Sequence, residues 1–141
     1  MSKPNPVVHF EMGYNDKDRM IAFYQNVFGW ETKPMGEEMG NYVVAHTAAT
    51  DDNGMILTPG AINGGFYKKA GPSSQAPSIV VSVDEIREAM RAVIESGGTI
   101  LGSMNEDGQH SDEPQMIPGV GLWISAMDTE ENRFSIMQPN A

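Results

Sequence analysis

The stretch PVVHFEMGYNDKDRMIAFYQNVFGW, residues 6–30, decides how the chain folds. Its apolar start, residues 7–12, predicts a strand. After a polar turn, four large apolar side chains follow the i, i+3, i+4, i+7 spacing of one helix face: Met20, Phe23, Tyr24 and Val27. We expect Asn15 or Asp16 to cap this helix and Gly29 to end it in the left-handed conformation.

The second half of the chain repeats this order. Residues 78–83 (SIVVSV) predict a strand, and an amphipathic helix follows, with Gly97 and Gly98 at its end. Its expected buried positions are Ile86, Ala89, Met90, Val93 and Ile94. We expect Ser82 or Asp84 to cap this helix, with Glu85 completing a capping box on Ser82.

Three further strands are expected after each helix. They are residues 30–33, 41–47 and 61–69 in the first half, and residues 99–102, 121–127 and 133–138 in the second. Residues 70–77 (AGPSSQAP) predict a linker, and residues 103–118 form a long polar insert. The chain is therefore expected to be one α+β domain, residues 1–141, with modules at about 5–69 and 78–139.

Composition excludes several classes of function. No window of the 141 residues approaches the roughly 18 apolar residues of a membrane span. Nine Lys and Arg against 19 Asp and Glu give a net charge of −10, which opposes binding to nucleic acid. The absence of cysteine excludes disulfides and thiolate chemistry and favours a cytoplasmic location.

Three segments carry a family resemblance: AFYQNVFGW (22–30), VDEIREAMRAVIESGG (83–98) and PGVGLWISAMDTEENRFSIMQP (118–139). Through them the chain resembles the vicinal oxygen chelate superfamily, also called the glyoxalase/bleomycin-resistance/dioxygenase group. The resemblance implies two βαβββ modules whose eight strands curl round one open, barrel-like cavity. It also implies a homodimer, since members often pair.

Metalloenzymes of this family bind a divalent cation at four cavity positions. The resemblance places these positions on His9, within residues 63–65, on Ser78 and on Ser135. Divalent cations prefer carboxylate or imidazole ligands, which serine hydroxyl and glycine cannot replace. We therefore expect no metal at this location and no cofactor, with a divalent metal on relocated ligands as the alternative.

Strand alternation predicts which side chains line the cavity. Val8, Phe10 and Met12 should face the first helix, which leaves the neighbouring polar residues for the cavity. The expected ligand contacts are His9, Glu11, Tyr42, His46, Asn63, Ser78, Trp123, Ser125, Ser135 and Met137. Aromatic rings, hydroxyls, imidazoles and methionine together suit a small amphipathic organic ligand.

His9 and Glu11 are the candidate catalytic pair, because an imidazole beside a carboxylate is expected to have a raised pKa and to transfer protons. The alternative is a hydrogen-bonded pair that only lines a wall. Gly64 and Gly65 predict either a strand bulge or a close approach of the backbone to a ligand. The insert 103–118, with its acidic residues and His110, is expected to be a solvated mobile loop or a lid.

The sequence therefore favours a cytoplasmic, metal-free, small-molecule-binding protein, and leaves open whether it is an enzyme. One alternative is a glyoxalase-like lyase or isomerase that uses His9 and Glu11 or a relocated metal. Another is an interaction module whose open sheet is covered by a second subunit.

Overall fold

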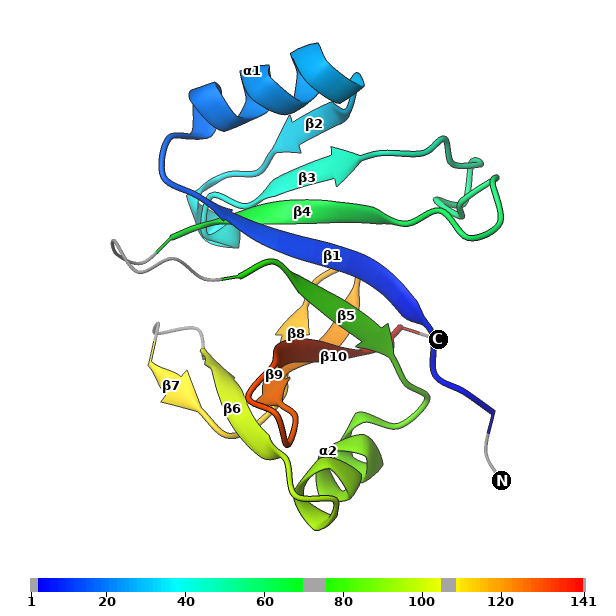
Figure 1. Ribbon diagram of the computed structural model, residues 1–141, viewed down its shortest axis with the longest axis vertical. Helices are drawn as coiled ribbons and strands as arrows, with labels where there is room; N and C mark the ends of the chain where they lie inside the picture. Colours follow the sequence, from blue (N-terminus) through cyan, green and yellow to red (C-terminus); the bar gives the residue numbers. More distant parts are fainter. Residues whose placement is uncertain (1–2, 70–75, 105–108, 141) are drawn as a thin grey trace. The chain divides into compact units, whose positions relative to one another are not determined.

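The computed structural model describes residues 3–69, 76–104 and 109–140. The chain divides into two compact units (Figure 1). The first unit is His9–Pro77, and the second is Met1–Val8 with Ser78–Ala141. The predicted linker 70–77 falls mostly on residues 70–75, and Glu106 and Asp107 of the insert fall on 105–108, so these lie outside the described residues.

The first unit is a four-stranded sheet with one helix on one face (Figure 1). Its elements are β1 (Val7–Tyr14, in this unit from His9), α1 (Lys17–Phe28), β2 (Glu31–Pro34), the 3-10 turn η1 (Glu37–Met39), β3 (Val43–His46) and β4 (Asn63–Lys68). The strand order is β2-β3-β4-β1. Only β1 and β4 pair in parallel, because α1, β2 and β3 carry the chain back between them.

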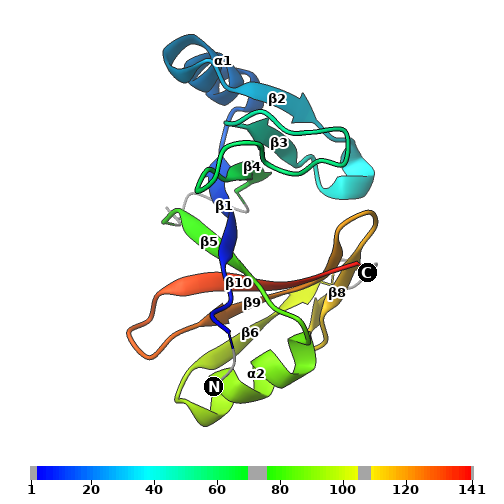
Figure 2. The ribbon, with the colours of Figure 1, turned by 90° about the vertical axis from the view of Figure 1, so that its right-hand side faces the viewer.

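The second unit has a similar arrangement, with α2 on one face of its sheet (Figure 2). It has two additional short strands. Its elements are β5 (Ser78–Ser82), α2 (Ile86–Glu95), β6 (Thr99–Met104), β7 (His110–Ser111), β8 (Gln115–Ile117), β9 (Gly121–Met127) and β10 (Arg133–Pro139). The order is β5-β10-β9-β6-β7, and β8 pairs with the start of β9. Neither helix of the described chain is long and apolar enough to cross a membrane.

The α+β class and the two βαβββ modules are confirmed. What the sequence did not indicate is that the polar insert contributes β7 and β8. These strands are two and three residues long, so no alternation of apolar and polar residues could reveal them. Pairing with β6 and β9 creates them, which is tertiary context rather than local propensity.

The described part of the insert is held to the rest of its unit. The Ser103 hydroxyl donates to the carbonyl of Glu113 at 2.6 Å, and the Glu113 carboxylate pairs with Arg87 of α2 at 2.5 Å. His110 Nε2 donates to the carbonyl of Leu101 at 2.8 Å. The expectation of a loop is therefore wrong for β7 and β8, whereas most of residues 109–118 are exposed, as a solvated insert predicts.

The core of the first unit lies between α1 and its sheet. Its buried residues are Tyr14, Val43, Ala45 and Phe66, with Phe10, Met12, Met20, Ile21, Tyr24 and Trp30 packed against them. Tyr24 stacks on Trp30 with ring centroids 4.8 Å apart. The predicted buried face of α1 is half wrong, because Phe23 and Val27 are 54% and 55% exposed. The helix is rotated so that Met20, Ile21 and Tyr24 meet the sheet instead.

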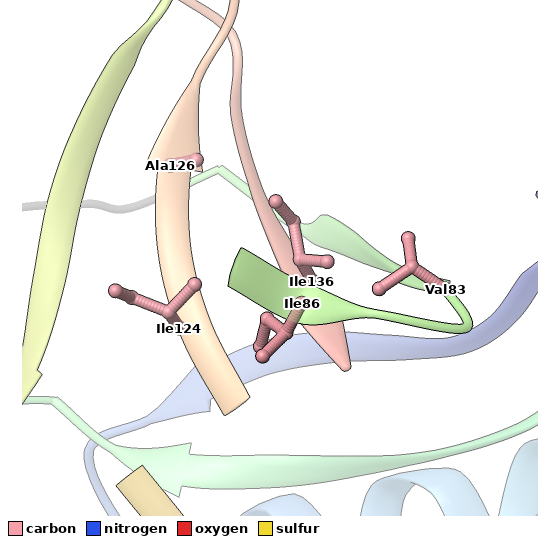
Figure 3. Packing of buried hydrophobic residues seen from close by; sticks show 5 residues of the cluster. All are labelled: Val83, Ile86, Ile124, Ala126 and Ile136. Carbon is pink, nitrogen blue, oxygen red and sulfur yellow. The ribbon is translucent and has the colours of Figure 1, made fainter. Parts of the chain in front are cut away.

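The core of the second unit lies between α2 and its sheet (Figure 3). Its buried residues are Val83, Ile86, Ile124, Ala126 and Ile136. Four of the five predicted apolar positions of α2 pack there, but Ile94 is 60% exposed. This helix therefore faces its sheet as the 3.6-residue period predicts, except at its last turn.

The helix ends follow the sequence for α1 but not for α2. Asp16 accepts from Arg19 N at 3.0 Å, and Gly29 ends α1 with φ 70°, as expected. For α2 the predicted capping box on Ser82 is wrong: Glu85 is the capping residue and accepts from Arg87 N at 3.1 Å. The amide of Ile86 donates to Gln138 Oε1 of β10 at 2.9 Å. A side chain 52 positions away thus satisfies a helix donor, which local sequence cannot indicate.

Candidate functional site

The sheet of the first unit has a helix-covered face and an opposite face, which we call the open face. Phe10 and Met12 pack in the core under α1, as alternation along β1 predicts. His9 and Glu11 therefore point to the open face, where Tyr42 meets both of them. The structure thus brings together three of the residues that the sequence singled out, two from β1 and one from the residue directly before β3, more than 30 positions along the chain.

A hydrogen-bonded chain joins these three side chains, and we call it the His9–Tyr42–Glu11 cluster. Tyr42 Oη donates to Glu11 Oε2 at 3.2 Å, and His9 Nε2 lies 3.0 Å from the same hydroxyl. A phenol has one proton, so once it is donated to Glu11 the oxygen can only accept from His9 Nε2–H. This assigns the proton of the neutral ring to Nε2 and leaves Nδ1 as a hydrogen-bond acceptor.

The protonation states of the cluster differ from the sequence expectation. Burial lowers the pKa of His9 from its ordinary value of 6.5, whereas the sequence led us to expect a raised pKa beside a carboxylate. Glu11 acts on Tyr42 instead: burial first, then the charge and the hydrogen bond of Glu11, strongly raise the pKa of Tyr42. His9 is therefore a neutral imidazole and Tyr42 a neutral phenol at pH 7.

The lowered pKa of His9 predicts how the stability of the protein changes with pH. Near pH 6.5 the unfolded chain protonates His9 and the folded chain does not, so the free energy of unfolding falls as pH decreases through that value. His9→Asn removes this dependence, so the melting-temperature gap between the wild type and the variant should narrow from pH 7.5 to 5.5. A gap that widens on acidification, or an imidazole NMR titration midpoint above 6.5, would contradict the assignment.

Gly64 and Gly65 make room for two aromatic rings on the two faces of β4. A Cβ at Gly65 would overlap the ring of Tyr42, and one at Gly64 would overlap the ring of Phe10. The pairing of β4 with β1 runs through both residues without a register shift. The bulge is therefore wrong, and side-chain packing requires both glycines; a close approach of a ligand to this backbone stays a prediction.

Asn63 and His46 also come from the predicted contacts in this unit. The Asn63 Oδ1 atom accepts from the amides of Thr47 and Ala48 at 2.8 and 3.0 Å, so it fixes the chain where β3 ends. His46 is the last residue of β3, four positions after Tyr42, and lies opposite Glu31 of β2 in the antiparallel register. Neither residue takes part in the two hydrogen bonds that join His9, Tyr42 and Glu11.

The remaining predicted contacts share one face of the sheet of the second unit. Ser125 and Ser135 face each other across β9 and β10, as do Trp123 and Met137. Both serines are only 3% exposed. Ser78 lies on the same face, because Val80 two residues further along β5 is the parallel partner of Ser135.

Arg133 is a residue of this face that sequence reasoning missed. It lies two positions before Ser135 on β10, and its Nε donates to Ser125 Oγ at 3.1 Å. Alternation placed Ser135 and Met137 on this face, and the same rule extended by one step would have found Arg133. Its guanidinium is the group on this face best suited to a carboxylate or phosphate.

The residues at the metal positions implied by the family do not fit a divalent cation. Asn63 Oδ1 already accepts hydrogen bonds from two backbone amides, and His9 Nε2 is hydrogen-bonded to the Tyr42 hydroxyl. Ser135 offers only a buried neutral hydroxyl, a poor ligand for such ions. Within residues 3–69, 76–104 and 109–140, no group of three or more His, Asp or Glu side chains could hold a metal. That the protein binds no metal stays a prediction.

Comparison with known proteins places the chain in a family. The family model of the Glyoxalase/Bleomycin resistance protein/Dioxygenase superfamily matches residues 7–113, which is most of the chain. Among proteins of curated function, none matches significantly.

Several solved structures share the fold at low identity. A hypothetical protein from Bacillus halodurans C-125 superposes with a TM-score of 0.65 and 13% identity, covering 99% of this chain and 97% of that one. Methylmalonyl-CoA epimerase in complex with methylmalonyl-CoA and ammonium gives 0.65 and 16%, covering 97% and 96%. A variant of the Streptomyces coelicolor methylmalonyl-CoA epimerase with 2-nitronate-propionyl-CoA gives 0.63 and 15%, covering 96% and 95%. At such identities the likeness shows the fold alone.

Proposed function

Because this chain belongs to the Glyoxalase/Bleomycin resistance protein/Dioxygenase superfamily, we propose that it is a small-molecule-binding protein that recognises its ligand without a metal ion. The observation that carries the proposal is the His9–Tyr42–Glu11 cluster on the open face of the first unit. Structural neighbours that bind small organic ligands, among them acyl-CoA derivatives, support the class of function.

The chemistry of the cluster specifies what such a ligand would offer. A neutral imidazole with a free lone pair on Nδ1 accepts a hydrogen bond, and the Glu11 carboxylate accepts too. Both favour a ligand with N–H or O–H donors. Tyr42 holds the two acceptors in place through its single hydroxyl, so the site is organised before the ligand arrives.

We propose that the other predicted contacts bind a ligand on the sheet face of the second unit. Trp123 and Met137 supply apolar surface beside each other, and Ser78, Ser125 and Ser135 supply hydroxyls. Arg133, hydrogen-bonded to Ser125, would recognise an anionic group. A cytoplasmic location and a homodimer belong to the same proposal. The first is supported by the cysteine-free composition, and light scattering in solution tests the second.

A ligand screen on chelator-treated protein tests the proposal. A thermal-shift panel of aromatic compounds, glycopeptides and thiol conjugates, including methylmalonyl-CoA, should give at least one saturable binder. A ligand at a hundred times its dissociation constant adds about 2.7 kcal/mol of stability. No response across the panel would favour the interaction-module alternative.

Two matched tyrosine variants then locate the site. Tyr42→Phe removes the hydroxyl that joins His9 to Glu11, and should weaken the binder about tenfold or more, the size of a lost hydrogen bond to a charged group. Tyr24→Phe is the control, because Tyr24 belongs to α1 and packs against the opposite face of the sheet. Its hydroxyl contacts Met12 Sδ at 4.0 Å. Equal losses from the two variants would contradict the assignment.

A lyase or isomerase is the second candidate, and the state of His9 favours it. A neutral imidazole with an unprotonated Nδ1 is a competent general base at pH 7. If this reading holds, the protein should exchange the hydrogen on the carbon between the two carbonyl groups of methylmalonyl-CoA for deuterium in D2O, followed by proton NMR. His9→Gln should abolish that exchange. Binding of the same compound without exchange would leave the protein a binder.

A further inference from the structure

An open surface pocket of about 280 Å³ lies in the first unit, away from the open face. Its lining residues are Tyr14, Asn15, Lys17, Asn41 and Lys68, and we call it the lysine pocket. Tyr14 belongs to the core under α1, and Lys68 is its partner in the parallel pair of β1 and β4. Both therefore lie on the helix-covered side of the sheet, opposite to His9 and Glu11.

Apart from the Tyr14 hydroxyl, the polar side chains of this pocket have no partners within the described part of the chain. No hydrogen bond or ion pair ties the side chains of Asn15, Lys17, Asn41 or Lys68 to another described residue. The chain has only nine Lys and Arg against 19 Asp and Glu, so carboxylate partners are abundant elsewhere. Two unpaired ammonium groups at one pocket are therefore a local concentration of positive charge in an acidic protein.

The floor of the lysine pocket is rigid. The buried hydroxyl of Tyr14 donates to the carbonyl of Asn41 at 2.7 Å. The backbone amide of Asn41 donates to the carbonyl of Gly36 at 3.1 Å. The φ of Asn41 is 58°, a left-handed conformation that asparagine tolerates better than most residues. On the other side, Lys69 N donates to the Tyr14 carbonyl at 3.0 Å, which holds the end of β4 in place. The lining is thus organised without a ligand.

The carboxylates on either side of Lys17 form no ion pair with the two described lysines of the pocket. Asp16 caps α1 by accepting from Arg19 N, and Asp18 lies in the first turn of the helix. Among the described residues, no acidic side chain lines the pocket. The side-chain amides of Asn15 and Asn41 provide hydrogen-bond donors in addition to the two ammonium groups. Lysine ammonium groups recognise phosphate as compact point charges.

We propose that the lysine pocket binds a phosphoryl group, either as free phosphate or as the phosphate of a small organic molecule. Lys17 and Lys68 would neutralise its charge, and Asn15 and Asn41 would donate to its oxygens. This site is separate from the proposed ligand site on the open face. Its failure would leave the role of the His9–Tyr42–Glu11 cluster untouched.

Two double variants of equal charge test this proposal. Inorganic phosphate, a nucleoside monophosphate and acetate are titrated into wild-type protein at low ionic strength and followed by calorimetry. Phosphate binding should saturate at one per chain, and acetate should bind far more weakly. The Lys17→Gln/Lys68→Gln variant should bind phosphate at least about tenfold more weakly. The Lys3→Gln/Lys33→Gln variant loses the same charge outside the pocket, and its affinity for phosphate should be unchanged.

The outcomes separate a site from general charge attraction. Equal weakening in the two double variants, or no saturable phosphate binding to the wild type, would overturn the proposal. Tighter binding of the nucleoside monophosphate would identify a phosphorylated organic ligand, whereas equal affinity would identify phosphate alone.

A second measurement uses only the wild type, so it does not depend on whether the variants fold: the backbone amide NMR shifts are followed as phosphate is added. They should be largest at Asn15, Lys17 and Asn41, and shifts centred elsewhere would contradict the site.

Discussion

Phe66→Ala should lower the free energy of unfolding by about 3–5 kcal/mol, the range observed when a buried phenylalanine is truncated. Phe66 is 1% exposed and lies at the centre of the aromatic cluster of the first unit. Its ring is 5.0 Å from that of Tyr24, 6.3 Å from Phe10 and 6.4 Å from Trp30. Three rigid rings cannot collapse easily into the space, so the cavity should remain and the cost should be near the top of the range.

The matched control is Phe23→Ala on α1. Phe23 is the same residue type in the same unit, but it is 54% exposed, so its truncation should cost well under half as much. Urea unfolding followed by circular dichroism and tryptophan fluorescence gives both values. Equal losses would mean that the rotation of α1 described above is wrong, and that Phe23 is buried as its helical spacing suggested.

Ile86→Ala should be the most damaging change in the second unit. Ile86 is fully buried at the start of α2, against Ile124 and Ile136 of the sheet (Figure 3). Truncation of a buried isoleucine costs about 2–5 kcal/mol. Since small domains are stable by only about 5–15 kcal/mol, this change should remove a large fraction of the total.

Ile94→Ala is the control within the same helix. Ile94 is 60% exposed, so its replacement by alanine, the best helix former, should cost little. The two variants truncate the same type of side chain and differ only in its position along α2. A thermal or urea unfolding series in which Ile94→Ala is as damaging as Ile86→Ala would contradict the packing of α2.

The sequence predicted the fold because its patterns are local. Alternation along β1 separated Phe10 and Met12 from His9 and Glu11, and the structure places these pairs on opposite faces. The same rule placed Trp123, Ser125, Ser135 and Met137 on one face, and the register of β9 and β10 sets them opposite each other. Gly29 ended α1 because only glycine adopts the left-handed conformation at no cost.

What the sequence missed depends on contacts between distant segments. The rotation of α1, which exposes Phe23 and Val27, follows from how Tyr24 stacks on Trp30 and packs against Phe66. The lowered pKa of His9 follows from burial, whereas proximity to Glu11 along the strand suggested the opposite. The insertion of Tyr42 between His9 and Glu11 requires Gly65, a relation that spacing alone does not disclose.

The central claim is that the His9–Tyr42–Glu11 cluster binds a small organic molecule without a metal. The most direct test is an NMR titration of chelator-treated protein with the strongest binder of the ligand panel. The account predicts saturable binding at one per chain, with the largest shifts at His9, Glu11 and Tyr42. Binding that appears only after a divalent cation is added, or shifts that leave these three residues unmoved, would contradict it.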